Sequence, residues 1–423
     1  MTLHTLSMGS LYLMSGPPAS GKSTLLKNLN LPEGAVISSD SIRNQLYGVK
    51  KYFKGGVEKG SLYGWDKNGY TVFAIMAEMI NARLREGLTT FVDAMNLEDI
   101  DRKYFIDLAQ KIGCDYKVMI FNVPLDELHR RNNARYFEVS PEIIDEGFKK
   151  FQRTSEYPYI TIEPEDTVEL TPLTLKGTHF DVVGDCHGLL DDFLKLLKKL
   201  GYQHNEEGVP YHPEGRKLVF LGDVIDRGQQ SVLMLHYVEQ AVRLGGHYFI
   251  PGNHEEKLAR TWEFWVKTGE AVGRSRSNTE TFLSLMKQPM DVQERLIRFI
   301  QHQPAYRIIE TPHEQFACVH SDIEYFNPLE TPRSGVMYGS SFNGDYDTDL
   351  KYQEAYEKGL NQYTLLRGHV LSTSFQNNVH SIEFDQAYDG DLAILQIDKY
   401  VEAKHVQRMP VQRAFDEACA KQR

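Results

Sequence analysis

FDVVGDCHG (residues 180–188), KLVFLGDVIDRG (217–228) and HYFIPGNHEE (247–256) are the stretches that decide the fold. In each, an apolar run rich in Val, Phe, Leu or Ile ends at a glycine, and polar residues follow at once. Between them, residues 189–200 and 231–244 carry apolar side chains at helical spacing. This alternation predicts parallel strands with their carboxyl ends at one edge of a sheet.

The polar residues after these strands are metal-ligand types. We expect five of them to converge at the sheet edge: Asp185, His187, Asp223, Asn253 and His254. Such residues also occur in ordinary turns, but three successive strand ends with the same chemistry favour a site. Carboxylate, amide and imidazole groups without thiolates suit a pair of Mn, Fe, Zn or Ni ions.

These motifs resemble DxHG, GDxxDRG and GNHE of the binuclear metallophosphoesterases. The resemblance implies an α/β sandwich holding two divalent metals, with Mn²⁺ expected. It adds His320, in FACVHSD, and His369, in LLRGHVL. The implied ligand set is Asp185, His187, Asp223, Asn253, His320 and His369. Arg227 would then neutralise phosphoryl oxygens, and His254 would protonate the leaving alkoxide.

Length and composition predict a soluble protein of two or three domains. The chain has 423 residues, of which 41% are hydrophobic and 25% charged. A net charge of −11 argues against bulk coating of nucleic acid, but not against a local basic pocket that grips a strand end. With no signal or membrane-spanning pattern and four cysteines without CxxC spacing, we expect a cytoplasmic protein, in a bacterial cell or a phage-infected host.

A second motif opens the chain. The apolar run 11–15 precedes GPPASGKS (16–23) and a helical stretch, 24–29, so GxxxxGKS lies between a strand and a helix. Backbone N–H groups of such a loop bind phosphates, Lys22 reaches the β/γ oxygens, and Ser23 holds Mg²⁺. The expected nucleotide-binding residues are Gly16, Ser20, Gly21, Lys22, Ser23, Thr24 and Asp93.

Charged residues follow the next predicted strands. Asp40 and Arg43 come after the strand 35–39. Asp40 could deprotonate a hydroxyl and Arg43 clamp an anion; alternatively, Asp40 caps the helix to Tyr47 and Arg43 is solvated. Arg131 and Arg135 share one face of the helix 125–135, which is either a solvated face or a lid over a triphosphate.

These residues resemble the 5′-hydroxyl polynucleotide kinases over residues 9–155, in the order GxxxxGK[ST], SxDxxR, DxTNL and RNxxR. The resemblance implies that ATP with Mg²⁺ binds the P-loop and that Asp40 is the general base. Arg43 would contact the acceptor strand's phosphate, and Arg131 and Arg135 the donor phosphates. Two departures stand out: Met95 replaces the usual Thr, and residues 136–138 (Tyr, Phe, Glu) replace a stretch that often carries a further Arg.

The expected fold class is α/β throughout. A P-loop parallel-sheet domain (1–155) precedes a proline-containing linker (156–176), which could also pair locally as an edge strand. A metallophosphoesterase domain (177–423) follows, with a helical insert at about 257–303. In that insert Trp262 and Trp265 either stack on a nucleotide or, as we favour, pack on the core, and the role of Arg274 and Arg276 stays open. A second sheet is expected from RIIE, FACVHSD, TLLRGHVL, SIEFD and LAILQID, and a solvated helix from residues 409–423.

One catalytic acid is less sharply placed than the others. In bacterial end-healing phosphatases an acid follows the last ligand strand. Asp385 in SIEFDQAYDGDL takes that position, with Asp389 and Asp391 as nearby competitors.

The whole chain resembles bacterial polynucleotide kinase-phosphatases of RNA repair, without their ligase-like domain. The resemblance implies repair of RNA or DNA strand ends, with ATP as donor and a separate ligase for sealing; the oligomeric state stays open. One rival is a signalling-type phosphatase, acting on proteins or dinucleoside polyphosphates, fused to a small-molecule kinase. The other, a non-catalytic scaffold, does not explain two complete ligand sets.

Overall fold

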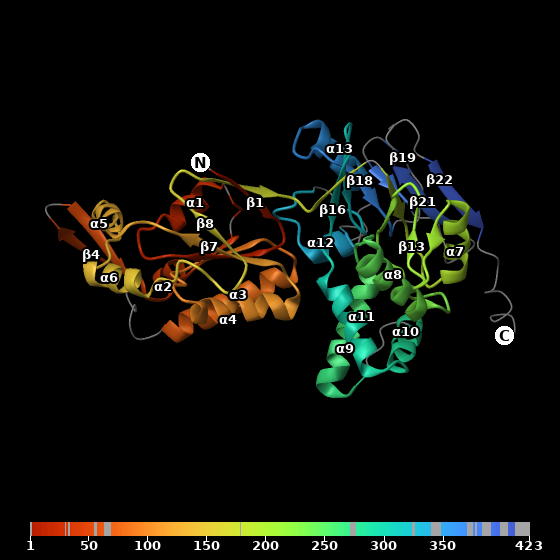
Figure 1. The fold of residues 1–423 in the computed structure, drawn as a ribbon, viewed down its shortest axis with the longest axis horizontal. Helices are drawn as coiled ribbons and strands as arrows, with labels where there is room; N and C mark the ends of the chain where they lie inside the picture. The colour runs from red at the N-terminus through yellow and green to blue at the C-terminus, as the bar shows by residue number, and fades with distance from the viewer. Residues whose placement is uncertain are drawn as a thin grey trace. The chain divides into compact units, whose positions relative to one another are not determined.

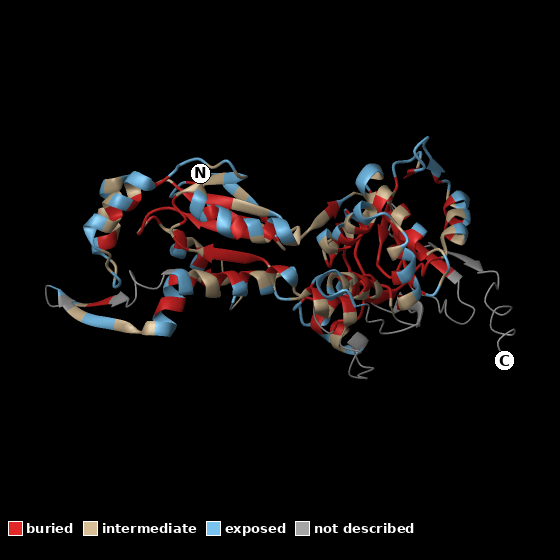
Figure 2. Cartoon of the chain, turned by 90° about the horizontal axis from the view of Figure 1, so that it is seen from below, coloured by how far each residue is buried: buried red, intermediate tan, exposed pale blue. Residues whose placement is uncertain are grey.

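The computed structural model describes residues 2–29, 31–32, 34–54, 57–62, 69–177, 179–270, 276–323, 326–339, 348–369, 375–376, 379–382, 391–397 and 405–410. The chain divides into two compact units. The first comprises Met1–Pro172 and Pro328–Glu330; the second comprises Leu173–Asn327 and Thr331–Arg423. Buried strands lie at the centre of each unit, with exposed residues on the surrounding helices (Figure 2).

The first unit is built on a five-stranded sheet in the order β3-β6-β2-β7-β8 (Figure 1). All its pairings are parallel. The strands are β2 (Leu11–Ser15), β3 (Val36–Ser38), β6 (Thr90–Asp93), β7 (Tyr116–Phe121) and β8 (Tyr159–Ile162). The helices are α1 (Lys22–Asn28), α2 (Ser39–Tyr47), α3 (Gly69–Arg85), α4 (Asp99–Ile112), α5 (Leu125–Asn133) and α6 (Pro141–Lys150). The predicted parallel P-loop sheet is confirmed.

Strand β2 shows why this sheet is buried on both faces. Its side chains alternate, so Leu11 and Leu13 join the core that contains residues of α3 and α4, whereas Tyr12 and Met14 join a second core with α1. A strand covered on both sides needs apolar residues at every position, which explains the continuous run LYLM.

The segment 156–176, predicted as a linker that could pair locally as an edge strand, contains short strands that lie at sheet edges, and the boundary between the two units falls inside it. It contains β8, which pairs with β7, and β9 (Thr167–Thr171), which pairs with β1 (Leu3–Ser7). It also contains β10 (Thr174–Lys176), which belongs to the second unit. The prolines at positions 158, 164 and 172 fall between these strands, where a missing N–H costs no ladder bond.

The second unit contains two sheets. The first has the order β15-β14-β11-β21-β22, with β11 (Phe180–Val183), β14 (Lys217–Phe220), β15 (Tyr248–Phe249), β21 (Asp391–Ile397) and β22 (His405–Pro410). The second has the order β10-β16-β17-β18-β20-β19, with β16 (Arg307–Glu310), β17 (Gln315–Cys318), β18 (Thr364–Arg367), β19 (Phe375–Gln376) and β20 (Val379–Ser381). Val182 and Val219 of the first sheet share one buried core with Phe316 and Leu366 of the second, so the predicted sandwich is present.

Two predictions about these sheets need correction. Residues 392–397 of LAILQID lie in β21, which belongs to the first sheet and runs antiparallel to β11, because a buried apolar run does not say which sheet it joins. Met409 and Pro410 end β22 and do not start a helix, since their strand pairs with β21. Asp385 and Asp389 lie outside the described residues, as does the chain after Pro410; Asp391 begins β21.

Helices complete the second unit. They are α7 (Leu190–Lys199), α8 (Ser231–Gly245), α9 (Asn253–Thr268), α10 (Arg276–Met286), α11 (Met290–His302), α12 (Arg333–Tyr338) and α13 (Thr348–Glu357), beside a small hairpin of β12 (Gln203–His204) and β13 (Pro210–Tyr211). The helical insert is therefore present as α9–α11 (Figure 1). Trp262 and Trp265 pack on the core, as we favoured, and the indole N–H of Trp262 donates to Gln293 Oε1 at 3.1 Å. Arg274 and the side chain of Arg276 lie outside the described residues.

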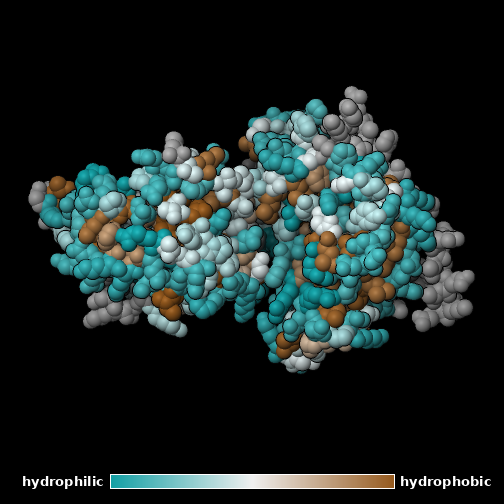
Figure 3. All heavy atoms as spheres, in the orientation of Figure 1, coloured by the Kyte–Doolittle hydropathy of each residue, from teal (hydrophilic) through white to brown (hydrophobic). Residues whose placement is uncertain are grey.

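The surface facing the viewer in Figure 3 is mostly hydrophilic, with scattered apolar side chains. Within the described ranges, every helix is too short or too polar to serve as a membrane span.

Candidate functional sites

The loop between β2 and α1 has the form of a phosphate-binding loop. Gly21 precedes α1 with φ 103°, a backbone conformation that favours glycine. The buried Lys22 ammonium donates to the carbonyl oxygens of Gly16 at 2.7 Å and Pro17 at 2.8 Å. Burial is the main cause that lowers the pKa of Lys22 to about 8. The loop therefore holds its cation at the position where phosphate would arrive.

Ser23 and Asp93 meet beside this lysine. Asp93 ends β6, and its Oδ2 accepts a hydrogen bond from Ser23 Oγ at 2.9 Å. Burial raises the pKa of Asp93, although the Lys22 charge opposes that rise. A hydroxyl and a carboxylate placed together fit Mg²⁺, which prefers oxygen ligands.

Asp40 and Arg43 lie in α2. The cap of that helix is Ser38, whose Oγ accepts from Ser41 N at 3.4 Å, so the alternative that Asp40 is the cap is wrong. Arg43 is buried rather than solvated, and its guanidinium donates to Asp40 Oδ1 at 3.2 Å. The Asp40 carboxylate itself is half exposed.

The arginines of α5 share a cavity with these groups. The cavity measures about 1550 Å³, and the P-loop, Asp40, Arg43, Arg131 and Arg135 all line it. Arg131 donates to Glu127 Oε1 at 2.6 Å and reaches Ser20 O at 3.5 Å. The lining residues of this cavity include Pro18, Ser20, Gly21, Lys22, Ser23, Thr24, Asp40, Arg43, Asp93, Met95, Arg131 and Arg135.

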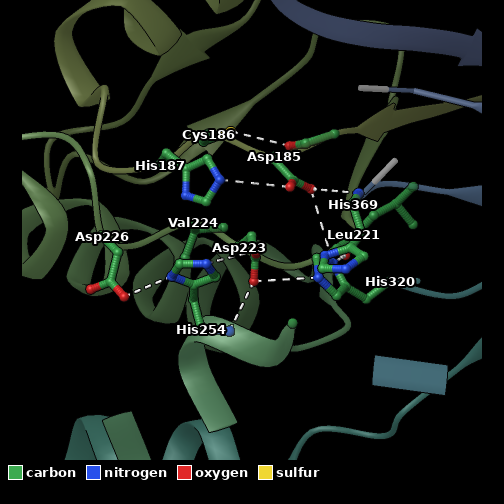
Figure 4. Close-up of polar contacts among 12 residues, drawn as sticks. Asp185, Cys186, His187, Leu221, Asp223, Val224, Asp226, His254, His320 and His369 are labelled. Atoms are coloured by element: carbon green, nitrogen blue, oxygen red, sulfur yellow. Dashed lines mark hydrogen bonds and ion pairs between the residues drawn. The ribbon is translucent and has the colours of Figure 1, made fainter. Parts of the chain in front are cut away.

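In the second unit, the predicted ligands are brought together at the carboxyl ends of the strands (Figure 4). Two groups of ligand atoms, each within 4.8 Å of one another, are His187–Asp223–His254 and Asp223–His320–His369. Asp223 is common to both groups and is therefore placed to bridge two ions. The Asp185 carboxylate lies 3.8 Å from His187 Nε2 and 3.9 Å from His320 Nδ1.

The imidazoles are oriented as metal ligands require. His187 Nδ1 donates to Ile225 O at 2.8 Å and His320 Nδ1 donates to Leu221 O at 2.7 Å, so in the neutral imidazole each Nε2 is the nitrogen left to ligate a metal. Within the described residues, these two buried Nε2 atoms and Asn253 Oδ1 have no hydrogen-bond partner. Burial lowers the pKa of His187 to about 3, which keeps that imidazole in its neutral, ligating form. The residues present fit a pair of divalent metals.

Comparison with known proteins agrees with this geometry. Residues 178–392, just over half of the chain, match the family described as calcineurin-like phosphoesterase. The chain belongs to that family. Residues 11–158 match an AAA domain, the P-loop part of the molecule.

Individual relatives of this calcineurin-like phosphoesterase are bacterial. An asymmetrical bis(5′-nucleosyl)-tetraphosphatase of Bacillus cereus is 28% identical over 226 residues, 51% of this chain and 89% of the relative. Its Geobacillus counterpart is 49% identical over 80 residues, 19% of this chain and 32% of that relative. Among solved structures, a Saccharomyces cerevisiae protein serine/threonine phosphatase aligns with TM-score 0.38 and 15% identity, covering 58% of this chain and 85% of that one.

Sequence reasoning assigned no role to two acids of the phosphoesterase site. Asp226 Oδ2 lies 2.7 Å from His254 Nδ1, so the acid orients that imidazole. Glu255 accepts from Gly252 N at 2.7 Å and from Asp223 N and Val224 N, both at 2.9 Å, and its buried carboxylate thus ties the second and third motifs together. Asp226 is the second aspartate of GDxxDRG, and Glu255 is the glutamate of GNHE. These motifs were the sequence signal from which both acids could have been found.

Several residues of the phosphoesterase site, both ligands and other motif residues such as Arg227 (φ 61°), have an unusual backbone conformation. His187 (φ 40°), Asp223 (φ 46°), Asp226 (φ 67°) and His369 (φ 62°) have positive φ, which non-glycine residues adopt rarely. Such strain costs about 1–3 kcal/mol per residue and concentrates at functional sites. At Gly252, a Cβ would lie 2.2 Å from Asp223 Oδ1, so this position must be glycine for the ligands to approach.

The remaining predicted residues lie around this phosphoesterase centre. Arg227 is exposed beside His187, and its charge helps to lower the pKa of that imidazole.

Two buried residues, Arg367 and Asp322, form an ion pair between the loops that carry His369 and His320. Burial opposes ionisation of His254, but Asp223 and Asp226 outweigh it and raise its pKa.

Proposed function

We propose that the chain repairs the two ends of a broken nucleic-acid strand. The P-loop domain would transfer the γ-phosphate of ATP to a 5′-hydroxyl, and the phosphoesterase domain would remove a 3′-phosphate or 2′,3′-cyclic phosphate. The observation that carries the proposal is the shared cavity of the first unit. It holds a phosphate loop with two arginines and, in the same space, the Asp40–Arg43 pair.

The roles follow from position. Lys22, Arg131 and Arg135 would neutralise the transferring phosphate, and Ser23 with Asp93 would hold Mg²⁺. The half-exposed Asp40 carboxylate can accept the acceptor's proton, while buried Arg43 orients it. A cavity of about 1550 Å³ exceeds the roughly 300–1,000 Å³ of small-ligand sites, which supports room for donor and strand end together.

In the phosphoesterase domain, Asp185, His187, Asp223, Asn253, His320 and His369 would hold two divalent metals, and we propose Mn²⁺ because imidazole ligands favour transition ions. When bound, such metals supply charge neutralisation and a nucleophile usable at neutral pH. Arg227 would bind the phosphoryl oxygens at the rim. His254, held through Nδ1 by Asp226, would protonate the departing ribose oxygen from Nε2.

Phosphate transfer is the test of the first half. Labelled γ-phosphate of ATP should appear on a 5′-hydroxyl oligonucleotide, and Lys22→Ala should abolish that transfer while aryl phosphate hydrolysis stays near wild type. Asp40→Asn should remove transfer but keep ATP affinity, because its carboxylate acts on the acceptor. Loss of ATP affinity in Asp40→Asn would return Asp40 to a structural role.

A second candidate for the phosphoesterase half is hydrolysis of dinucleoside polyphosphates, the activity named for its Bacillus cereus relative. Parallel assays on a 3′-phosphate oligonucleotide and on diadenosine tetraphosphate separate the two. The end-repair proposal requires a higher kcat/KM on the oligonucleotide.

Reconstitution with Mn²⁺ or Mg²⁺ after chelation tests which metal the phosphoesterase uses. Robust activity in Mg²⁺ alone would contradict our choice of Mn²⁺.

The products define the expected partners. RNA or DNA with a 5′-phosphate and a 3′-hydroxyl is ready for a separate ligase, and adding a ligase to the reaction should seal the strand.

The described cysteines, Cys114, Cys186 and Cys318, are free thiols, which supports our proposal that the protein works in the cytoplasm.

A further inference from the structure

The hairpin of β4 (Val49–Lys54) and β5 (Val57–Leu62) lies against the chain that follows the arginine helix α5. Gly60 of β5 donates its N–H to Tyr136 O at 3.0 Å and forms an isolated bridge with Phe137. A Cβ at Gly60 would lie 2.7 Å from both of those rings, so the contact is as close as a glycine permits. The hairpin and residues 133–138 are therefore packed directly together.

Lys59 makes the innermost contact. Its side chain is buried, and its ammonium donates to Asn133 O at 3.2 Å and to Arg135 O at 2.5 Å. Asn133 is the last residue of α5, where helix carbonyls lack partners and a cation is favourable, and Arg135 lies two residues beyond it. Lys59 thus holds the last turn of the helix that carries Arg131.

Further from Lys59, the hairpin contacts residues 136–138, the stretch that departs from the polynucleotide kinase pattern. The Tyr136 hydroxyl donates to Glu58 Oε1 at 2.9 Å, and the Lys54 ammonium donates to Glu138 Oε1 at 2.5 Å. Tyr136, Phe137 and Glu138 occupy the stretch where a further arginine is often found. In this chain they bind the hairpin instead.

Residues 133–138, which the hairpin contacts, extend to the phosphate site. Gly60, Phe137, Arg131 and Arg135 all line the cavity that contains the P-loop. Arg131 reaches Ser20 O of that loop at 3.5 Å. The charge of Arg135 is one of the influences that lower the pKa of Lys22, after burial. A displacement of residues 133–138 would therefore move Arg135 directly and would disturb the last turn of α5, which carries Arg131.

We propose that the β4–β5 hairpin positions the arginine lid of the kinase site, with Lys59 as the positioning residue. The inference rests on the proposed function, because the lid matters only if ATP binds the P-loop. Its chemistry is simple: a buried ammonium fixes the carbonyl end of α5, and the pairs at Glu58 and Glu138 fix the segment beyond it. The arginines are then in place before nucleotide arrives.

The test compares Lys59→Met with Lys50→Met, which removes the same charge from an exposed position of the same hairpin. Lys59→Met should raise the Kd and KM for ATP and lower kcat/KM for transfer to a 5′-hydroxyl oligonucleotide by about 10- to 100-fold, since small displacements of catalytic groups are costly. Lys59→Arg should recover part of the loss because it restores two donors. Lys50→Met should behave as wild type.

Hydrolysis of nitrophenyl phosphate by the second domain is an internal control for protein concentration and integrity. If Lys59→Met unfolds the first domain, the double variant Lys54→Met/Tyr136→Phe removes only the outer bonds and should weaken ATP binding severalfold. Wild-type ATP affinity and transfer in Lys59→Met, or equal losses in Lys50→Met, would overturn the inference. A wild-type chain that binds ATP but transfers nothing to a 5′-hydroxyl would overturn the proposed function alone.

Discussion

The two sites of this chain are built in opposite ways. The phosphoesterase site uses mostly short, buried side chains on strand-end loops, and five of its residues hold positive φ. The P-loop site uses long side chains from helices around a cavity of about 1550 Å³. Backbone at strand ends fixes most of the first site. In the second site Ala19 and Asn96 also have positive φ, but its charged groups depend in addition on side-chain contacts such as that of Lys59 with Asn133 O. The first should tolerate few changes, and the second should respond gradually.

The largest expected effect is from Asp223→Ala. Asp223 belongs to both groups of ligand atoms, so its loss removes a ligand from each metal position. We expect all hydrolysis of 3′-phosphate ends and of nitrophenyl phosphate to disappear, together with bound metal in elemental analysis. Phosphate transfer should stay near wild type. Asp191→Ala, at an exposed position of α7, is the matched control, and loss of kinase activity in Asp223→Ala would show that the sites depend on each other.

His254→Ala should lower hydrolysis of a 3′-phosphate end by about 10²–10⁴, the usual scale of general acid catalysis. A ribose hydroxyl is a poor leaving group and needs the proton, whereas nitrophenolate leaves without much help. The loss on nitrophenyl phosphate should therefore be far smaller, with metal content unchanged. Equal losses on the two substrates, or metal-depleted protein, would assign His254 to the metals instead.

Asp226→Asn should have an intermediate effect. The asparagine can still accept from His254 Nδ1, but the negative charge that helps orient the imidazole is lost. Partners of this kind typically contribute about 10- to 100-fold. Steady-state kinetics on a 3′-phosphate oligonucleotide would measure the loss. Wild-type kcat/KM in Asp226→Asn would mean that the contact has no catalytic role.

The smallest effect concerns pH at the P-loop. Burial lowers the pKa of Lys22 to about 8, and bound phosphates should raise it again. ATP affinity should therefore be level below pH 8 and fall by about tenfold per pH unit as pH rises above it, because binding then takes up one proton. Calorimetry at pH 9 in two buffers would detect that uptake. Lys22→Arg, whose guanidinium stays charged, should show no uptake; proton-neutral binding by wild type would contradict the assignment.

Much of both sites was predictable because their chemistry sits in short segments. A strand, a turn and the residues after it are neighbours in sequence, so GDCHG, GDVIDRG, GNHEE and GPPASGKS predict which side chains stand at a sheet edge. The likeness between 178–392 and the calcineurin-like phosphoesterases covers the first three of these segments, and the match of 11–158 to an AAA domain covers the fourth. The metal roles of these residues and the base role of Asp40 stay predictions.

Other features depend on contacts between distant residues. The apolar run of β21 predicts a strand, but not its place beside β11, more than 200 positions earlier. Prolines in 156–176 suggested a linker, yet short strands between them found partners in both units. Trp262 and Trp265 were ambiguous until the core around Gln293 was known.

The sequence by itself determined two α/β units, a P-loop and a set of metal-ligand residues, because local spacing decides which residues end a strand or open a helix. Only the tertiary structure decided that Arg43 is buried against Asp40, that Asp226 orients His254, and that Lys59 holds the end of α5. The last two contacts join residues 28 and more than 70 positions apart. Burial and partner choice at such separations depend on how the whole chain packs, which no local pattern encodes.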